Sequence, residues 1–185
     1  MNSKYINITL LLLLATTFSY AQRFVSKDGH ASFFSEAPLE NIEAHNHQVT
    51  SLLDLQKNEV VASMNMKSFE FDNSLMEEHF NENYLESEKY PKATFQGVFK
   101  SAAPIDAAKN GSYPVEADGK LTIHGVTQPV KLNGTLEVKD NIITVRGKFN
   151  IAIKDYKIDV PTLVVKNIAE VVEVTVDFKY SPQKI

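Results

Sequence analysis

Two histidines, His45 and His47, are the residues whose spacing best suits metal chemistry. Side chains two positions apart on a β-strand point to the same face, and paired imidazoles can bind Zn²⁺ or Cu²⁺. The same phase continues through Val49, Leu53 and Leu55, which predicts that both imidazoles face the interior. No cysteine and no third strand histidine at a fixed spacing completes a ligand set. We therefore predict no metal site, with His45 and His47 as the candidates for the alternative.

Catalytic chemistry has no comparable group of residues. The chain contains no cysteine, which excludes disulfides, thiolate metal sites and a cysteine nucleophile. It has neither a Gly-x-Ser-x-Gly elbow nor a glycine-rich phosphate loop. Five glutamates between residues 77 and 88 form an acidic stretch, but their helical spacing is typical of a solvated face. We predict a protein that is not an enzyme and that needs no cofactor for catalysis.

Composition and charge narrow the class of protein further. The chain has 185 residues, of which 43% are hydrophobic and 23% charged, as in ordinary globular domains. That length suits one domain. The formal net charge is −4 and no run of Lys or Arg occurs, so we expect no nucleic-acid partner.

The first segment is typical of a secretory signal peptide. Lys4 and the amino terminus supply positive charge, residues 6–15 are almost wholly apolar, and Ser19 and Ala21 place small residues where a signal peptidase cuts. The apolar stretch is short for a membrane span of about 20 residues. We predict a signal peptide over residues 1–21, cleaved after Ala21, and a periplasmic or secreted domain over 22–185.

Most of the remaining chain is predicted to form β-strands. Apolar and polar residues alternate with a period of two from residue 92 onward. Segments 126–138 and 143–153 each have one apolar face, and Asp140-Asn141 between them predicts a tight hairpin turn. The other strands are expected near 23–35, 42–56, 59–71, 92–100, 113–124 and 172–180. In the third of these strands the phase changes near Ser68, which predicts a bulge or a departure from the sheet.

One segment, residues 72–85, has the spacing of an amphipathic helix. Its apolar residues are Leu75, Met76, Phe80 and Tyr84. Ser74 and Glu77 fit a capping box, and Pro91 prevents the helix from continuing.

These elements predict an all-β fold. About eight strands, each with one apolar and one polar face, favour an eight-stranded antiparallel barrel of lipocalin type over helix-covered parallel strands. The helix would lie between the third and fourth strands. A two-sheet sandwich is the alternative, because alternation alone does not distinguish the two architectures.

Three stretches carry a resemblance to a known family. They are residues 66–97 (MKSFEFDNSLMEEHFNENYLESEKYPKATFQG), 119–130 (GKLTIHGVTQPV) and 147–159 (GKFNIAIKDYKID). Together they resemble the YceI-like family of secreted lipid-binding proteins. The resemblance implies a barrel whose bore holds an isoprenoid chain, as in polyprenols or quinone tails, and it implies no catalytic residues. Residues 71–74 and 76–80 depart from the family's common motifs, so the chain resembles a divergent branch.

Strand phase and the resemblance together predict a carrier whose interior binds an isoprenoid lipid, a quinone or another amphiphilic lipid. The helix is a candidate lid or a fixed plug, and Tyr84 could meet a polar head group. His124 is expected to be a turn residue whose ring bonds the backbone, with Gly125 supplying an unusual backbone angle. The predicted contacts in the bore or at its mouth are Met64, Met66, Phe69, Phe71, Met76, Phe80, Tyr84, Phe95, Ile123 and Phe149.

Two other functions stay open at this point. The first is a metal-binding or stress-protective protein that uses His45 and His47. The second is a protein-interaction barrel whose interior is full and binds no ligand. Edge strands of an incompletely closed barrel could also pair into a homodimer, and a lipid carrier could touch a membrane or a membrane protein transiently.

Overall fold

The computed structural model describes residues 23–160 and 168–183. The predicted signal peptide over residues 1–21, with its cleavage after Ala21, lies outside the described residues. In the part of the chain that is described, no helix has both the length and the apolar character needed to cross a membrane.

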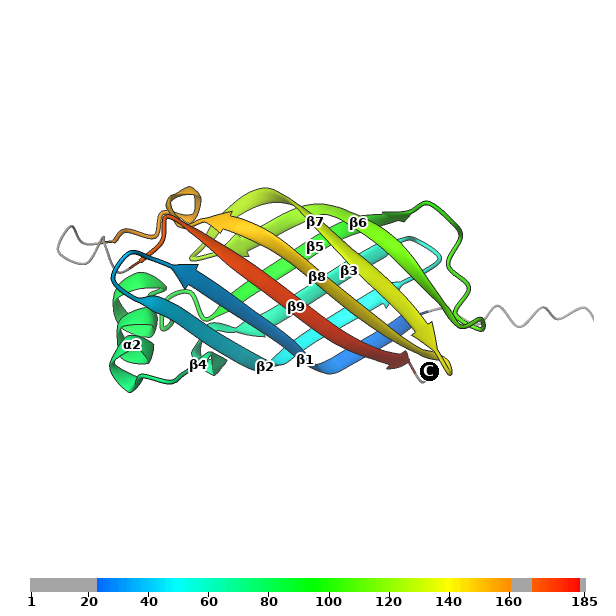
Figure 1. Ribbon diagram of the computed structural model, residues 1–185, viewed down its shortest axis with the longest axis horizontal. Helices are drawn as coiled ribbons and strands as arrows, with labels where there is room; N and C mark the ends of the chain where they lie inside the picture. The colour runs from blue at the N-terminus through cyan, green and yellow to red at the C-terminus, as the bar shows by residue number, and fades with distance from the viewer. Residues whose placement is uncertain (1–22, 161–167, 184–185) are drawn as a thin grey trace, which may run out of the picture.

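The long strands close into an antiparallel barrel (Figure 1). Strand β1 pairs with β2 on one side and with β9 on the other, which closes the ring of eight long strands. A ninth, two-residue strand, β4, adds to β2 outside this ring. The strands are β1 (Arg23–Glu36), β2 (Asn41–Asp54), β3 (Glu59–Asn65), β4 (Glu70–Phe71), β5 (Lys92–Ser101), β6 (Gly111–Ile123), β7 (Val126–Lys139), β8 (Ile142–Ala152) and β9 (Val171–Pro182).

The eight-stranded barrel predicted from the sequence is therefore confirmed, and the sandwich alternative is wrong. A sandwich would leave sheet edges, whereas each of the eight barrel strands is paired on both sides within the described residues. The possible homodimer stays a prediction.

The helical segment lies between β4 and β5, as predicted, at one end of the barrel (Figure 1). It consists of helix α2 (Ser74–His79) followed by a π-helical turn, η3 (Phe80–Tyr84). The predicted capping box of Ser74 and Glu77 is wrong. Asn73 is the N-cap, because its backbone is extended and its Oδ1 accepts hydrogen bonds from the amides of Leu75 and Met76.

The phase change predicted near Ser68 is a departure from the sheet. Strand β3 ends at Asn65, and a 3₁₀ turn, η2 (Met66–Ser68), leads the chain into β4. The Asn65 side chain accepts a hydrogen bond from the Lys67 amide and so caps this turn. The Met66 amide donates a hydrogen bond to the Pro91 carbonyl at 2.9 Å. This bond holds the start and the end of the helical insertion next to each other.

Two bulges in the β1–β2 pair overturn the prediction that His45 and His47 face the interior. Along β1 the register slips between Ser26 and Gly29, and along β2 it slips between Asn46 and Val49. The buried phase of β2 therefore changes from Ala44 and Asn46 to Val49, Ser51 and Leu53, and both histidines point outward. The sequence argument continued the phase of His45 and His47 onward to Val49 across a bulge, where two-residue periodicity no longer holds.

Gly29 lies inside the barrel at this irregularity. A Cβ atom there would stand 2.5 Å from Cδ1 of Phe178, closer than packed carbon atoms can approach. The glycine is thus required by the close packing of β1 against an aromatic ring of β9.

At the end of the barrel away from α2, buried polar side chains bond the strands together. The hydroxyl groups of Ser51 and Tyr180 are buried and lie 2.7 Å apart, joining β2 to β9. Burial also raises the pKa of Tyr180 above its ordinary range, so the phenol stays neutral.

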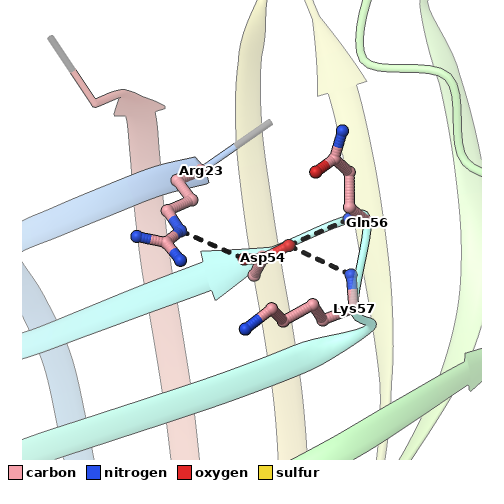
Figure 2. Close-up of polar contacts among 4 residues, drawn as sticks. All are labelled: Arg23, Asp54, Gln56 and Lys57. Carbon is pink, nitrogen blue, oxygen red and sulfur yellow. Dashed lines mark hydrogen bonds and ion pairs between the residues drawn. The ribbon is translucent and has the colours of Figure 1, made fainter. Parts of the chain in front are cut away.

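Asp54 ties the first residue of β1 to the β2–β3 turn at this same end (Figure 2). Its carboxylate accepts the Arg23 Nε–H at 3.1 Å and the amides of Gln56 and Lys57 at 3.0 Å each. Burial by itself would raise the pKa of Asp54. The bonds from Lys57, Arg23 and Gln56 outweigh that effect and hold the pKa below its usual range.

We predict that Asp54→Asn destabilises the fold at pH 7 by about 1–2 kcal/mol, because it weakens charge-assisted hydrogen bonds. The pKa of Asp54 is lower in the folded protein than in the unfolded chain, where it is about 3.9. The ionised carboxylate therefore stabilises the fold fully above about pH 3.9, and this contribution is lost as the pH falls through the folded-state pKa. Urea unfolding should therefore show a difference in the free energy of unfolding between variant and wild type that is smaller at pH 3 than at pH 7.

The matched control is Glu59→Gln, which changes the exposed carboxyl opposite Asp54 in β3 and should leave stability nearly unchanged. An equal loss of unfolding free energy in Asp54→Asn at both pH values would contradict this account of the Asp54 bonds.

Candidate functional site: an apolar cavity beneath the helix

A cavity of about 250 Å³ occupies the end of the barrel beside α2. It is lined almost wholly by apolar side chains, because the inward faces of several strands meet there beneath the helical segment. The described residues around it are Ala31, Phe33, Ser35, Glu40, Ile42, Met64, Met66, Phe69, Phe71, Met76, His79, Phe80, Tyr84, Leu85, Ala93, Leu121, Ile123, Phe149, Ile151, Ile153, Ile158, Val160, Ile168, Val172 and Val174.

The structure brings the residues predicted from strand phase to this interior. Phe95 instead lines a second, smaller cavity of about 100 Å³ farther along the bore. Around the larger cavity lie Met64, Met66, Phe69, Phe71, Met76, Phe80, Tyr84, Ile123 and Phe149.

Other cavity residues were not among the predicted contacts. Phe33 and Ile42 come from β1 and β2, where bulges obscure the alternation. Ile151, Val172 and Val174 lie on the apolar phases of β8 and β9 that the sequence did show, so extending the site along those phases would have found them. Ile158, Val160 and Ile168 lie outside regular strands and carry no periodic signal.

Four phenylalanine rings hold the helical segment against the mouth of the cavity. Phe80 of η3 lies 5.6 Å from Phe33, 5.5 Å from Phe69 and 5.1 Å from Phe71, measured between ring centroids. Tilted and offset aromatic contacts at these distances are favourable beyond the apolar area they bury. The segment is therefore an integral wall of the cavity in this conformation.

The polar groups of the cavity gather at its mouth. Glu40 comes from the connection between β1 and β2, His79 from the end of α2 and Tyr84 from the end of η3. Burial raises the pKa of Tyr84, so its hydroxyl is a neutral hydrogen-bond donor and acceptor. An amphiphile could place its tail in the bore and its polar end among these groups.

The two cavities share part of their lining. Met64, Leu121, Phe149 and Val174, from four different strands, contact both spaces. These four side chains therefore form the boundary between the cavities. Methionine is flexible and polarisable, so a boundary that contains Met64 can adjust to an occupant.

A polar clamp at the His124 ring fastens the helical segment to the barrel. The ring lies between the Glu86 carboxylate, 2.8 Å from Nε2, and the Tyr156 carbonyl oxygen, 3.2 Å from Nδ1. Both partners are acceptors, so the ring satisfies both only when each nitrogen carries a proton. The hydrogen bond from His124 lowers the pKa of Glu86. His124 is thus a turn residue whose ring bonds the backbone, as predicted.

Gly125 completes the β6–β7 turn with a φ of 72°. A Cβ at this position would stand 2.6 Å from Cε1 of Tyr90, whose ring packs edge-on to the His124 ring. The glycine therefore serves both the left-handed backbone and the close approach of Tyr90, which confirms the backbone angle expected from the sequence.

We predict that His124→Ala loosens the segment from η3 to β5 because it removes both bonds of the clamp. Hydrogen exchange of the amides between residues 80 and 90 should become at least tenfold faster. His79→Ala, which removes an exposed imidazole on α2, should leave that exchange unchanged. Equal exchange in wild type and His124→Ala would show that the aromatic contacts alone hold the segment.

Comparisons with known proteins agree with this architecture. A polyisoprenoid binding domain from Saccharophagus degradans is 14% identical, with a TM-score of 0.72 over 88% of this chain and 99% of that one. BcnA from Burkholderia cenocepacia is 19% identical, with a TM-score of 0.63 over 82% and 94%. The YceI protein of Campylobacter jejuni is 16% identical, with a TM-score of 0.57 over 81% and 90%.

These structures share the fold at low sequence identity. No protein of curated function matches the chain. The family model of the YceI-like domain matches residues 18–180, which covers all the barrel strands except the last two residues of β9. The chain belongs to the YceI-like domain family.

Proposed function

We propose that this protein is an extracytoplasmic carrier that holds an isoprenoid-type lipid, such as a polyprenol or a quinone tail. The tail occupies the bore and the polar head stays at the mouth. The observation that carries the proposal is the apolar cavity of about 250 Å³ beneath the helical segment, with polar groups confined to one end. The expected periplasmic or secreted location rests on the signal-peptide pattern of residues 1–21.

Apolar burial supplies enough free energy for such a ligand. Burying ten methylene-sized units is worth about 8 kcal/mol at ~0.8 kcal/mol each. A micromolar complex corresponds to about the same free energy, before the costs of association. One neutral hydrogen bond contributes only about 1 kcal/mol. Shape and apolar contact therefore dominate recognition, which fits a lining with few polar groups.

The size of the cavity bears on the kind of lipid. The two cavities together fall near the lower end of the ~300–1,000 Å³ found for small-molecule sites. A short isoprenoid, or one segment of a longer chain, fits the larger cavity alone. A longer tail has to displace the boundary side chains Met64 and Phe149 to reach the second cavity.

The relatives support the same class of ligand. The Saccharophagus degradans domain is described as polyisoprenoid-binding, and this chain shares its fold. The alternative of a filled interaction barrel is disfavoured by the space left inside the barrel. A packed interior has few voids larger than a water molecule.

Exposed aliphatic side chains also stand at the cavity end of the barrel. Leu39, in the β1–β2 connection, and Leu75, in the first turn of α2, are 69% and 56% exposed. Both belong to segments that line the mouth (Figure 1). Such side chains suit a transient contact with a membrane surface during loading or delivery of the lipid.

The first experiment is native mass spectrometry of residues 22–185, purified from the cell envelope without detergent and then extracted with solvent. We expect a discrete added mass that extracts as an isoprenoid. The variant Ile123→Trp fills the larger cavity and should lose the added mass. The matched variant Val98→Trp places the same ring on the exposed face of β5 and should keep it.

A bare protein mass that stays bare after incubation with geranylgeraniol and with a short-chain ubiquinone would overturn the carrier proposal. Retention of the added mass in Ile123→Trp would instead show that the bound molecule lies outside the larger cavity.

We also predict that Phe149→Ala shifts the preference toward longer tails, because it removes the largest side chain shared by the two cavities. Competition between a C10 and a C20 isoprenoid alcohol, read by native mass spectrometry, measures this preference. Phe99→Ala serves as the control, because Phe99 lines only the second cavity. An unchanged C10-to-C20 ratio in Phe149→Ala would mean that Phe149 does not limit tail length.

A further inference from the structure

Three histidines gather on the outer wall of the barrel, away from the lipid cavity. The bulge in β2 turns His45 and His47 outward, and His30 of β1 stands between their rings. The ring centroids of His30 lie 5.3 Å from His45 and 4.6 Å from His47. His45 and His47 are 6.2 Å apart by the same measure. Only the tertiary pairing of β1 with β2 makes this trio, which we name the outer histidine cluster.

We propose that the outer histidine cluster binds one divalent transition-metal ion of the class that prefers imidazole ligands, such as Cu²⁺ or Zn²⁺. The site is separate from the lipid cavity and does not depend on the carrier function. Imidazole nitrogen suits these ions, and Cu²⁺ is the tightest of the divalent series.

The spacing of the nitrogens fits this assignment. Nε2 of His30 lies 3.1 Å from Nδ1 of His45, so the two rings share one proton. Zn–N bonds of about 2.0–2.1 Å in a tetrahedral site place ligand nitrogens roughly 3.3 Å apart. A cation can therefore replace the shared proton with little movement of the strands, and metal binding of this kind releases protons.

The three rings must turn to converge on one ion. They stack nearly parallel, at interplanar angles of 13° to 16°. Within the described ranges, no three potential ligands already stand in metal-binding geometry. The His45 side chain is 42% exposed and His47 is exposed, so both have room to rotate about their side-chain bonds.

The charges around the cluster favour a cation. Burial, followed by the neighbouring His47 and His45, lowers the pKa of His30, so this ring is neutral and its lone pair is available at pH 7. Glu43 Oε1 lies 3.5 Å from Nε2 of His45 and can act as a further ligand or orient that ring. Asp177 of β9 also faces His30, but its carboxylate already accepts a hydrogen bond from Arg146.

The test uses residues 22–185 without a polyhistidine tag, titrated with Cu²⁺ in a calorimeter. We expect one equivalent to bind, with nitrogen hyperfine structure in the electron paramagnetic resonance spectrum. His30→Asn and His47→Asn should each weaken binding at least tenfold. Thr50→Asn changes an exposed residue on the same strand and should weaken it less than twofold. Binding of similar strength in wild type and His30→Asn would overturn the proposal, as would the absence of a one-to-one complex.

A second measurement needs no variant. Nitrogen-15 spectra of the histidine rings, recorded at pH 7 with and without Zn²⁺, should show zinc-dependent shifts of His30, His45 and His47. Zinc bound only to the native state should also raise the melting temperature. Ring shifts confined to His79 or His124 would place the metal elsewhere and contradict the assignment.

Discussion

The pairing of β1 with both β2 and β9 is the constraint on which the rest of the structure depends. It joins the two ends of the strand order into a ring, so the apolar faces of the strands surround a common interior. The closure needs two bulges in the β1–β2 pair and a glycine at position 29, where the ring of Phe178 leaves no space for a side chain. The same bulges turn the histidines of β2 toward solvent. They therefore affect both the closure of the barrel and the residues on its outer surface.

The barrel uses its two ends differently. At the end away from α2, Asp54 and the Ser51–Tyr180 pair bond the strands together beside the smaller cavity. At the other end the interior is left partly open and covered by α2 and η3, held by phenylalanine contacts and by the His124 clamp. The larger cavity therefore lies at the end that the helical segment covers. The proposed carrier function depends on this open volume, because a fully packed barrel has no room for a ligand.

In the proposed carrier function, recognition rests on the apolar volume and the shape of the cavity. The polar groups at the mouth come from the β1–β2 connection, from α2 and from η3, and they do not form one sequence motif. Low identity to relatives of the same fold is consistent with this, because many apolar side chains can line a bore of similar shape.

Local sequence by itself determined the strands, the hairpin turn at Asp140-Asn141, the helical insertion and the inward phases of Met64, Ile123 and Phe149, because alternation and helical spacing are properties of neighbouring residues. The tertiary structure alone decided the outward direction of His45 and His47, the approach of His30 to them, and the part that Phe33 plays in the cavity. A bulge shifts the phase by one residue and is set by the cross-strand register. Cavity volume likewise depends on how all the strands pack together, which no single segment specifies.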